Sequence, residues 1–130
     1  MNVTISSFGY GHAPAPTAHI TLDLRHNLRN PHHDPALRYL TGLNEQVRQH
    51  VLDTPGARTL IDHTAALTCG LLVAGLPVSI ATGCVGGRHR SVAVAEEIAA
   101  ELREAGAHVH VEHRDIAKPV LQLTTARGEA

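Results

Sequence analysis

The run of residues 78–112 constrains the fold more than any other part of the chain. Residues 78–81 (VSIA) are short and apolar, as in a buried strand, and residues 83–91 form a loop that contains three glycines. An amphipathic helix is expected after this loop up to a C-cap at Gly106, and residues 109–112 (VHVE) alternate as a strand does. A strand, a helix and a second strand in this order form a βαβ unit, which joins parallel strands.

The segments before residue 78 supply the rest of an α/β domain. Residues 3–8 (VTISSF) and 20–25 (ITLDLR) alternate apolar and polar residues, which is typical of strands. Residues 44–52 form a helix with an asparagine as a suitable N-cap, and apolar residues from 60 to 72 form a stripe at helical spacing. The sequence predicts a single-domain sandwich, with a largely parallel or mixed central sheet of about four strands flanked by helices.

The length of 130 residues is that of one domain. We expect residues 1–118 to form the folded part and residues 119–130 to be a flexible tail, because the chain has little to bury after residue 118. Two cysteines, Cys69 and Cys84, are too few for a disulfide framework. The apolar runs are too short to cross a membrane and the N-terminus lacks a secretory pattern, so we expect a cytoplasmic protein with no membrane partner.

Composition argues against a basic nucleic-acid-binding module. The net charge is −1 with neutral histidines, and the chain has one phenylalanine, two tyrosines and no tryptophan. Such a chain offers neither a positive surface for phosphates nor a set of rings for stacking bases. No cofactor is expected.

Eleven histidines raise the question of a metal site. No H-E-x-x-H or C-x-x-C motif occurs, and the adjacent His32 and His33 do not both point inward easily, so we expect no functional metal. His108 and His110 share one face of the last predicted strand, which is the pattern of a half-exposed strand. We expect His32 and His89 to be the functional histidines, as anion ligands or proton donors whose charge varies near neutral pH.

Residues 83–91 carry the strongest functional signal. They lie at the carboxyl edge of the predicted sheet, where ligands of α/β proteins bind. Free N–H groups of the loop and of the first helical turn attract an anion, together with the helix dipole, and Arg90 can clamp two of its oxygens. The alternative is a tight turn whose glycines only satisfy backbone geometry. We favour the anion site because arginine and glycine coincide there.

A competing interpretation of the same loop is catalytic. Residues 84–91 satisfy the C-x-x-G-x-x-R-S pattern of cysteine-dependent phosphatases, in which a thiolate attacks phosphorus and the arginine holds the oxygens. Cys84 and Arg90 would then be the catalytic residues, although Gly83 stands where those enzymes usually carry histidine. Catalysis also needs a general acid, and nothing local selects one from the candidates Asp23, Asp34 and Asp115. We favour binding over catalysis.

Five separated motifs follow one another along the chain. They are residues 7–12 (SFGYGH), 23–25 (DLR), 30–43 (NPHHDPALRYLTGL), 81–92 (ATGCVGGRHRSV) and 113–115 (HRD). In this order they resemble the C-terminal domain of the RapZ/YvcJ family, whose corresponding stretches include S-F-G-F-K-H, D-V-R and N-P-H-W. The resemblance extends over about residues 3–115, and several ordered motifs are far more specific than a single one.

The resemblance implies a small-ligand domain. Family members pair a P-loop ATPase-like domain with this C-terminal domain, but no G-x-x-x-x-G-K-[ST] occurs here, so nucleotide hydrolysis is not implied. The family's C-terminal domain resembles a phosphofructokinase subdomain and binds glucosamine-6-phosphate. For this chain we expect a ligand similar to glucosamine-6-phosphate or a nucleotide. RNA, a protein partner and homo-oligomers are also implied. The weak net charge and the loss of the family's basic C-terminal tail oppose RNA binding.

Carried onto this chain, the family's motifs imply a ligand site. Its residues are His32, Val85, Gly86 and Arg90, surrounded by Cys84, Gly87, His89 and Ser91, with Asp23, Arg25 and His12 nearby. Val85 stands where the family usually has threonine, so one hydroxyl contact is lost. Residues 25–31 replace the family's R-F-L-P-N-P by a loop one residue longer. We expect a regulatory sensor or adaptor for a small phosphorylated or anionic metabolite.

Overall fold

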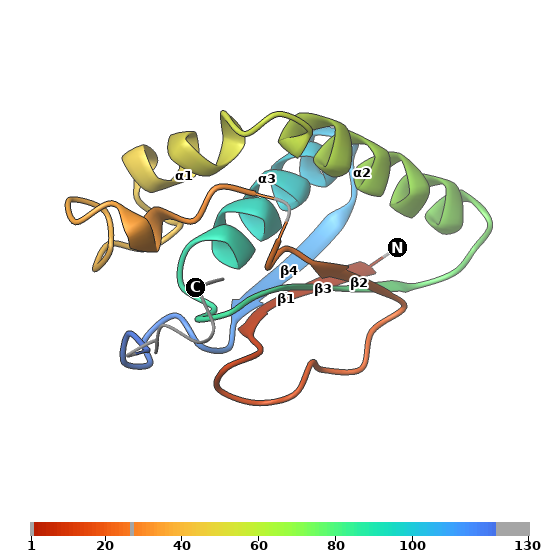
Figure 1. Cartoon of the computed structure of the whole chain (residues 1–130). Helices are drawn as coiled ribbons and strands as arrows, with labels where there is room; N and C mark the ends of the chain where they lie inside the picture. The colour runs from red at the N-terminus through yellow and green to blue at the C-terminus, as the bar shows by residue number, and fades with distance from the viewer. Residues whose placement is uncertain (1, 27, 122–130) are drawn as a thin grey trace.

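Four parallel strands form the sheet in the computed structural model, which describes residues 2–26 and 28–121 (Figure 1). The strands are β1 (Asn2–Gly9), β2 (Ile20–Asp23), β3 (Val78–Cys84) and β4 (His108–His113). The helices are α1 (Glu45–Leu52), α2 (Ala57–Val73) and α3 (Arg90–Glu104), with a short 3-10 helix, η1, over Pro31–His33. The predicted α/β fold with a largely parallel sheet of four strands is confirmed.

The order of the strands across the sheet is β2-β3-β1-β4. α3 carries the chain from β3 to β4, and β1 lies between these two strands, so the predicted βαβ unit encloses a third strand. β1 pairs with β3 as far as Gly9 and Cys84. Because the strands are parallel, the loops that follow β1 and β3 leave the sheet side by side at its carboxyl edge.

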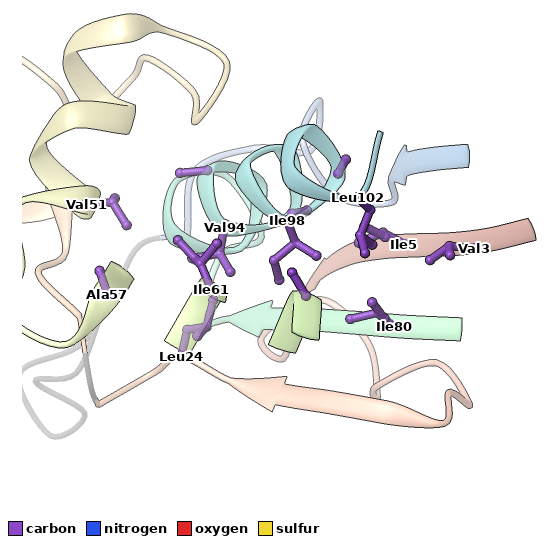
Figure 2. Close-up of a cluster of buried hydrophobic side chains, with 14 of the residues drawn as sticks. Val3, Ile5, Leu24, Val51, Ala57, Ile61, Ile80, Val94, Ile98 and Leu102 are labelled. Carbon is purple, nitrogen blue, oxygen red and sulfur yellow. The ribbon is translucent and has the colours of Figure 1, made fainter. Parts of the chain in front are cut away.

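The three helices lie over one face of the sheet (Figure 1). α3 packs on β1, β3 and β4, while α1 and α2 pack against α3. Alternate residues of the strands face this layer, and Ile5, Ile80 and Ile98 are at most 1% exposed. Figure 2 shows these side chains meeting between α3 and the sheet. Burial of each such side chain contributes about 1.5–3 kcal/mol to folding, so this layer fixes α3 on the sheet.

The helix boundaries follow local capping signals. α1 begins after Asn44, whose side chain accepts hydrogen bonds from the N–H groups of Gln46 and Val47, as predicted. α2 begins at Ala57, earlier than the apolar stripe indicates. After α3, Gly106 has a φ of 96°, in the left-handed region that glycine favours at a helix end.

Two strand ends differ from the prediction by two residues or more. β3 extends to Cys84 instead of residue 81, because pairing with β1 continues to Gly9. β2 ends at Asp23 instead of residue 25. The Asp23 carboxylate accepts a hydrogen bond from the N–H of Arg25 at 3.1 Å, and this local turn ends the strand.

A polar cluster beneath α3 ties three elements together. Ser7 Oγ of β1 lies 2.6 Å from His113 Nδ1 of β4, and His113 Nε2 lies 2.7 Å from Glu96 Oε2 of α3. Ser7 is fully buried. Buried polar groups cost free energy unless they are hydrogen-bonded, so this network specifies how α3 sits on the carboxyl half of the sheet.

The predicted tail is only partly described. Residues 119–121 lie against the folded domain, where they line a pocket, and residues 122–130 lie outside the described residues. In the described ranges, no helix has both the length and the apolar character needed to span a bilayer.

Candidate anion-binding site

The loop after β3 is pressed against the end of β1. Gly87 has a φ of 69°, and a Cβ atom there would lie 2.6 Å from the backbone nitrogen of Gly9. A Cβ at Gly9 would lie 2.5 Å from the carbonyl carbon of Gly86. Only glycine fits at Gly9 and Gly87, because any side chain would force the two backbones apart. The glycines of the two predicted motifs therefore meet in space.

Asp115 forms hydrogen bonds at the same contact between the end of β1 and the loop after β3. Its Oδ2 accepts hydrogen bonds from the Gly9 N–H at 2.7 Å and from Arg114 Nη2 at 2.8 Å, and its Oδ1 lies 2.6 Å from Lys118 Nζ. Burial raises the pKa of this carboxyl, but the hydrogen bonds from Arg114, Lys118 and Gly9 outweigh burial and lower the pKa to about 2. Asp115 is therefore ionised at neutral pH and cannot donate a proton as a general acid.

Several backbone N–H groups just before α3 lack a hydrogen-bond acceptor among the described residues. Within the described residues, the N–H groups of Gly86, Gly87, Arg88 and His89 donate no hydrogen bond, and no side chain caps this helix. A helix N-terminus carries about half a positive charge. Consecutive N–H groups at such a position bind phosphate or carboxylate oxygens.

A pocket of about 30 Å³, with room for about two water molecules, is lined by Gly86, Arg88 and His89, which carry three of these N–H groups. Its lining comes from three parts of the chain. The loop and the start of α3 contribute Cys84, Val85, Gly86, Arg88, His89 and Arg90; η1 and its cap contribute Asn30 and His32; the C-terminal segment contributes Pro119, Val120 and Leu121. No aspartate or glutamate is among these residues, so the lining is cationic.

Arg90 lines the pocket but also has a structural role. It is 2% exposed, and its Nη1 donates to the carbonyl oxygens of Leu24 at 3.0 Å and Arg25 at 2.7 Å. Burial lowers its pKa from the usual value. The side chain therefore joins the start of α3 to the end of β2, in addition to any contact with a ligand.

The two histidines expected to be functional both line the pocket. Burial, with a smaller contribution from the charge of Arg88, lowers the pKa of His89 to about 4, although the hydrogen bond to the Arg38 carbonyl acts in the opposite direction. The expectation that the charge of His89 varies near neutral pH is therefore wrong. His89 is neutral there, with its Nε2 donating to that carbonyl at 2.8 Å. Burial also lowers the pKa of His32, with further contributions from Arg38, His33 and Arg90.

Five lining residues were not among the predicted ligand contacts: residues 119–121, Asn30 and Arg88. Asn30 Oδ1 accepts a hydrogen bond from the His32 N–H at 3.1 Å, and in the described part of the chain its buried Nδ2 has no partner. Arg88 donates to the carbonyl oxygens of Tyr39, Leu40 at 3.1 Å and Ile116 at 3.4 Å. The N-P-H motif could have indicated Asn30, whereas the contacts of Arg88 depend on segments far apart in the sequence.

Five predicted site residues lie outside the pocket lining: His12, Asp23, Arg25, Gly87 and Ser91. Asp23 and Arg25 form an ion pair of 2.7 Å, and the Arg25 hydrogen bond lowers the pKa of Asp23. The Arg25 guanidinium stacks 3.9 Å from the centre of the Tyr10 ring. His12 lies in the turn after β1, where its N–H donates to the Gly9 carbonyl at 3.0 Å.

Cys84 is buried at 3% exposure, and its Sγ lies 3.2 Å from Ser91 Oγ. A phosphatase would need a proton donor beside this thiol. Of the candidate acids, Asp23 is paired with Arg25, Asp34 accepts a hydrogen bond from the Ala36 N–H, and Asp115 is ionised. None of these carboxylates lines the pocket. Among the described residues, no group of three or more histidine, cysteine, aspartate or glutamate side chains could hold a metal ion.

The chain was compared with known proteins. The model of the family described as "RapZ C-terminal domain" matches residues 1–117. The chain belongs to the RapZ C-terminal domain family. The match ends just before residues 119–121, so one wall of the pocket lies beyond the part that defines a RapZ C-terminal domain.

Curated relatives of this RapZ C-terminal domain carry the name "Nucleotide-binding protein". The chain is 42% identical to one from Thermobifida fusca over 125 residues, which cover 91% of this chain and 42% of that protein. It is 41% identical over 124 residues to SCO1952 of Streptomyces coelicolor, covering 91% of this chain and 41% of that protein. It is 42% identical over 120 residues to Rru_A3448 of Rhodospirillum rubrum, covering 88% of this chain and 37% of that protein. The chain thus spans about two fifths of the length of these relatives.

Proposed function

We propose that this domain binds a small phosphorylated or anionic metabolite at the loop between β3 and α3, and that it acts as a regulatory sensor or adaptor. The observation that carries the proposal is the row of N–H groups of residues 86–89, which have no partner within the described residues. Buried or partly buried N–H groups cost free energy when unpaired. Anion oxygens would satisfy them and would be stabilised by the helix dipole.

The charge of the pocket supports an anionic ligand. Arg88 and Arg90 lie in its lining and no acidic side chain of the described residues does, although the whole chain has a net charge of −1. His32 and the Nδ2 of Asn30 add side-chain donors on the opposite wall. A phosphate group has enough oxygens to accept hydrogen bonds from both walls.

Two ligand classes fit this chemistry. The resemblance to the RapZ/YvcJ family favours a phosphosugar of the glucosamine-6-phosphate type, and the names of the relatives favour a nucleotide. Those relatives are more than twice as long as the chain, so their name does not say which part of them holds the nucleotide. The phosphate is common to both classes, and we therefore centre the proposal on it.

Isothermal titration with inorganic phosphate, glucosamine-6-phosphate and adenine nucleotides tests the proposal. We expect saturable binding of phosphate and tighter binding of one of the two organic phosphates. The matched variants are His32→Ala and His33→Ala, because His32 lines the pocket while its neighbour His33 is exposed. Loss of one ligand hydrogen bond should weaken binding about fivefold to tenfold in His32→Ala and leave His33→Ala unchanged. Absence of binding to every phosphate compound would overturn the proposal.

A further inference from the structure

The pocket is too small, as it stands, for the ligand proposed. Its volume is about 30 Å³, whereas pockets that hold small organic ligands measure about 300–1,000 Å³. The structure therefore shows a closed form of the site. The three segments of the chain that line the pocket differ in the hydrogen bonds that hold them to the rest of the domain. This difference indicates which segment moves when the pocket opens.

Two of the three walls are fixed by hydrogen bonds. The loop after β3 is seated on β1 through the Gly11 N–H, which donates to the Val85 carbonyl at 2.9 Å. The η1 wall is held by Arg38, whose Nε donates to the His32 carbonyl at 2.8 Å. Opening either wall would break contacts within the folded domain.

The third wall consists of residues 119–121, and no comparable hydrogen bond to another described residue holds it. Up to Lys118 the chain is anchored, because the Lys118 N–H donates to the Asp115 carbonyl at 3.1 Å and its Nζ pairs with the Asp115 carboxylate. Beyond Lys118, no hydrogen bond in the described part of the chain involves residues 119–121. Residues 119–121 are therefore the part of the described pocket wall that can move with the fewest broken contacts.

Leu121 makes the closest contact of this wall. Its Cδ1 packs so tightly on Gly11 that a Cβ atom at Gly11 would lie 2.4 Å from it. The three side chains of the wall are apolar and cannot accept hydrogen bonds from the N–H groups of residues 86–89. The closed form is thus stabilised only by a small apolar contact, and it leaves the N–H groups of residues 86–89 unpaired. An entering anion would pair these N–H groups and so favour the open form.

We propose that residues 119–121 form a strap that closes the anion site and must be displaced before the ligand enters. This inference rests on the proposed function, because it concerns access to the same pocket. The association constant measured for the chain is then that of the open site multiplied by the fraction of molecules in which the strap is released.

The test compares phosphate affinities of full-length variants. Leu121→Ser removes the apolar contact of the strap. Gly11→Ala places a Cβ 2.4 Å from Leu121 Cδ1 and 3.1 Å from the Val85 carbonyl oxygen, so the closer contact, with the flexible end of the leucine, has to give way first. We expect both variants to bind inorganic phosphate about threefold to tenfold more tightly than the unaltered chain. The controls are Leu67→Ser, at an exposed leucine of α2, and Gly70→Ala, which has open space around it. Neither control should change the affinity.

A second readout follows the strap itself. The chain has no tryptophan, so a Val120→Trp variant carries a single indole within the pocket wall. Saturating phosphate should shift its emission to longer wavelength, because the indole moves into water. An unshifted emission at saturation, or equal phosphate affinity in Leu121→Ser, Gly11→Ala and the unaltered chain, would overturn the strap while the binding site stands. If none of the proteins binds phosphate, the proposed function fails and the strap fails with it.

Discussion

The carboxylate of Asp115 shows how one residue can have a different role from the one its motif suggests. The sequence places it among candidate general acids, but the structure buries it fully and surrounds it with the Gly9 N–H, Arg114 and Lys118. These partners come from both ends of the chain, so the ionised state of Asp115 could not be deduced from local sequence.

Asp115→Asn should therefore destabilise the fold. Loss of charge-assisted hydrogen bonds costs about 2 kcal/mol, whereas Asp62→Asn, at an exposed ion pair of 3.7 Å, should change stability by less than about 0.5 kcal/mol. Because the folded pKa of Asp115, about 2, lies below the usual aspartate value of 3.8, its stabilisation is complete above the unfolded pKa. The difference between the unaltered chain and Asp115→Asn should shrink between about pH 4 and pH 2 in urea unfolding. A pH-independent difference would contradict this role.

A substitution at Asn30 can change the charge of the pocket while it keeps the local hydrogen bond to the His32 N–H. Asn30→Asp keeps the oxygen that accepts from the His32 N–H but replaces the Nδ2 donor by a negative oxygen. Phosphate affinity should fall at least about tenfold, since a like charge would face the anion. Asn44→Asp makes the same change at the N-cap of α1, where aspartate caps equally well, and should leave binding and melting temperature nearly unchanged. Equal phosphate binding by both variants would remove Asn30 from the site.

At the scale of the elements, the sequence predicts those helices and strands whose position depends on local patterns of apolar and capping residues. The α3 stripe, the Asn44 cap and the alternation of β1 and β4 all appear where the periodicity puts them, because apolar spacing decides which face is buried. The position of β1 inside the β3–α3–β4 unit, the anchoring of Arg90 and the wall of residues 119–121 depend on pairings between distant segments. Such pairings leave no periodic signal in one sequence.

α3 should be the element on which both stability and the site depend. Ile98 is fully buried between α3 and the sheet, so Ile98→Ala should lower the free energy of unfolding by about 3–4 kcal/mol. Leu67→Ala, at a leucine of α2 that is 52% exposed, should cost less than about 1 kcal/mol. Urea unfolding followed by circular dichroism measures both. Similar losses in the two variants would contradict the placement of the core.

At the scale of the whole molecule, the cationic pocket is a local feature of a nearly neutral chain. The net charge of −1 leaves no long-range attraction to a polyanion, although Arg88 and Arg90 sit together at the pocket. Strand β4 adds an exposed row of His108, His110 and Glu112, which contains no lysine or arginine. We therefore expect the molecule to bind a small anion in preference to a nucleic acid.

Fluorescence polarisation with a labelled structured RNA checks this preference. At about 0.15 M salt we expect no saturable binding by the chain, since too few phosphates would be neutralised to hold the complex. Tight binding that weakens steeply with added salt, and that persists with saturating small ligand, would instead indicate an RNA-binding adaptor.

The central claim is that the N–H groups before α3 hold the anion, and an amide NMR titration of nitrogen-labelled protein with inorganic phosphate tests it most directly. The amide signals of Gly86, Gly87, Arg88 and His89 should shift together and saturate at one dissociation constant, because each N–H gains an acceptor. Signals of the far end of the sheet, such as that of Asn2, should stay in place. If the loop amides do not move while phosphate binds elsewhere, the account of this site is wrong.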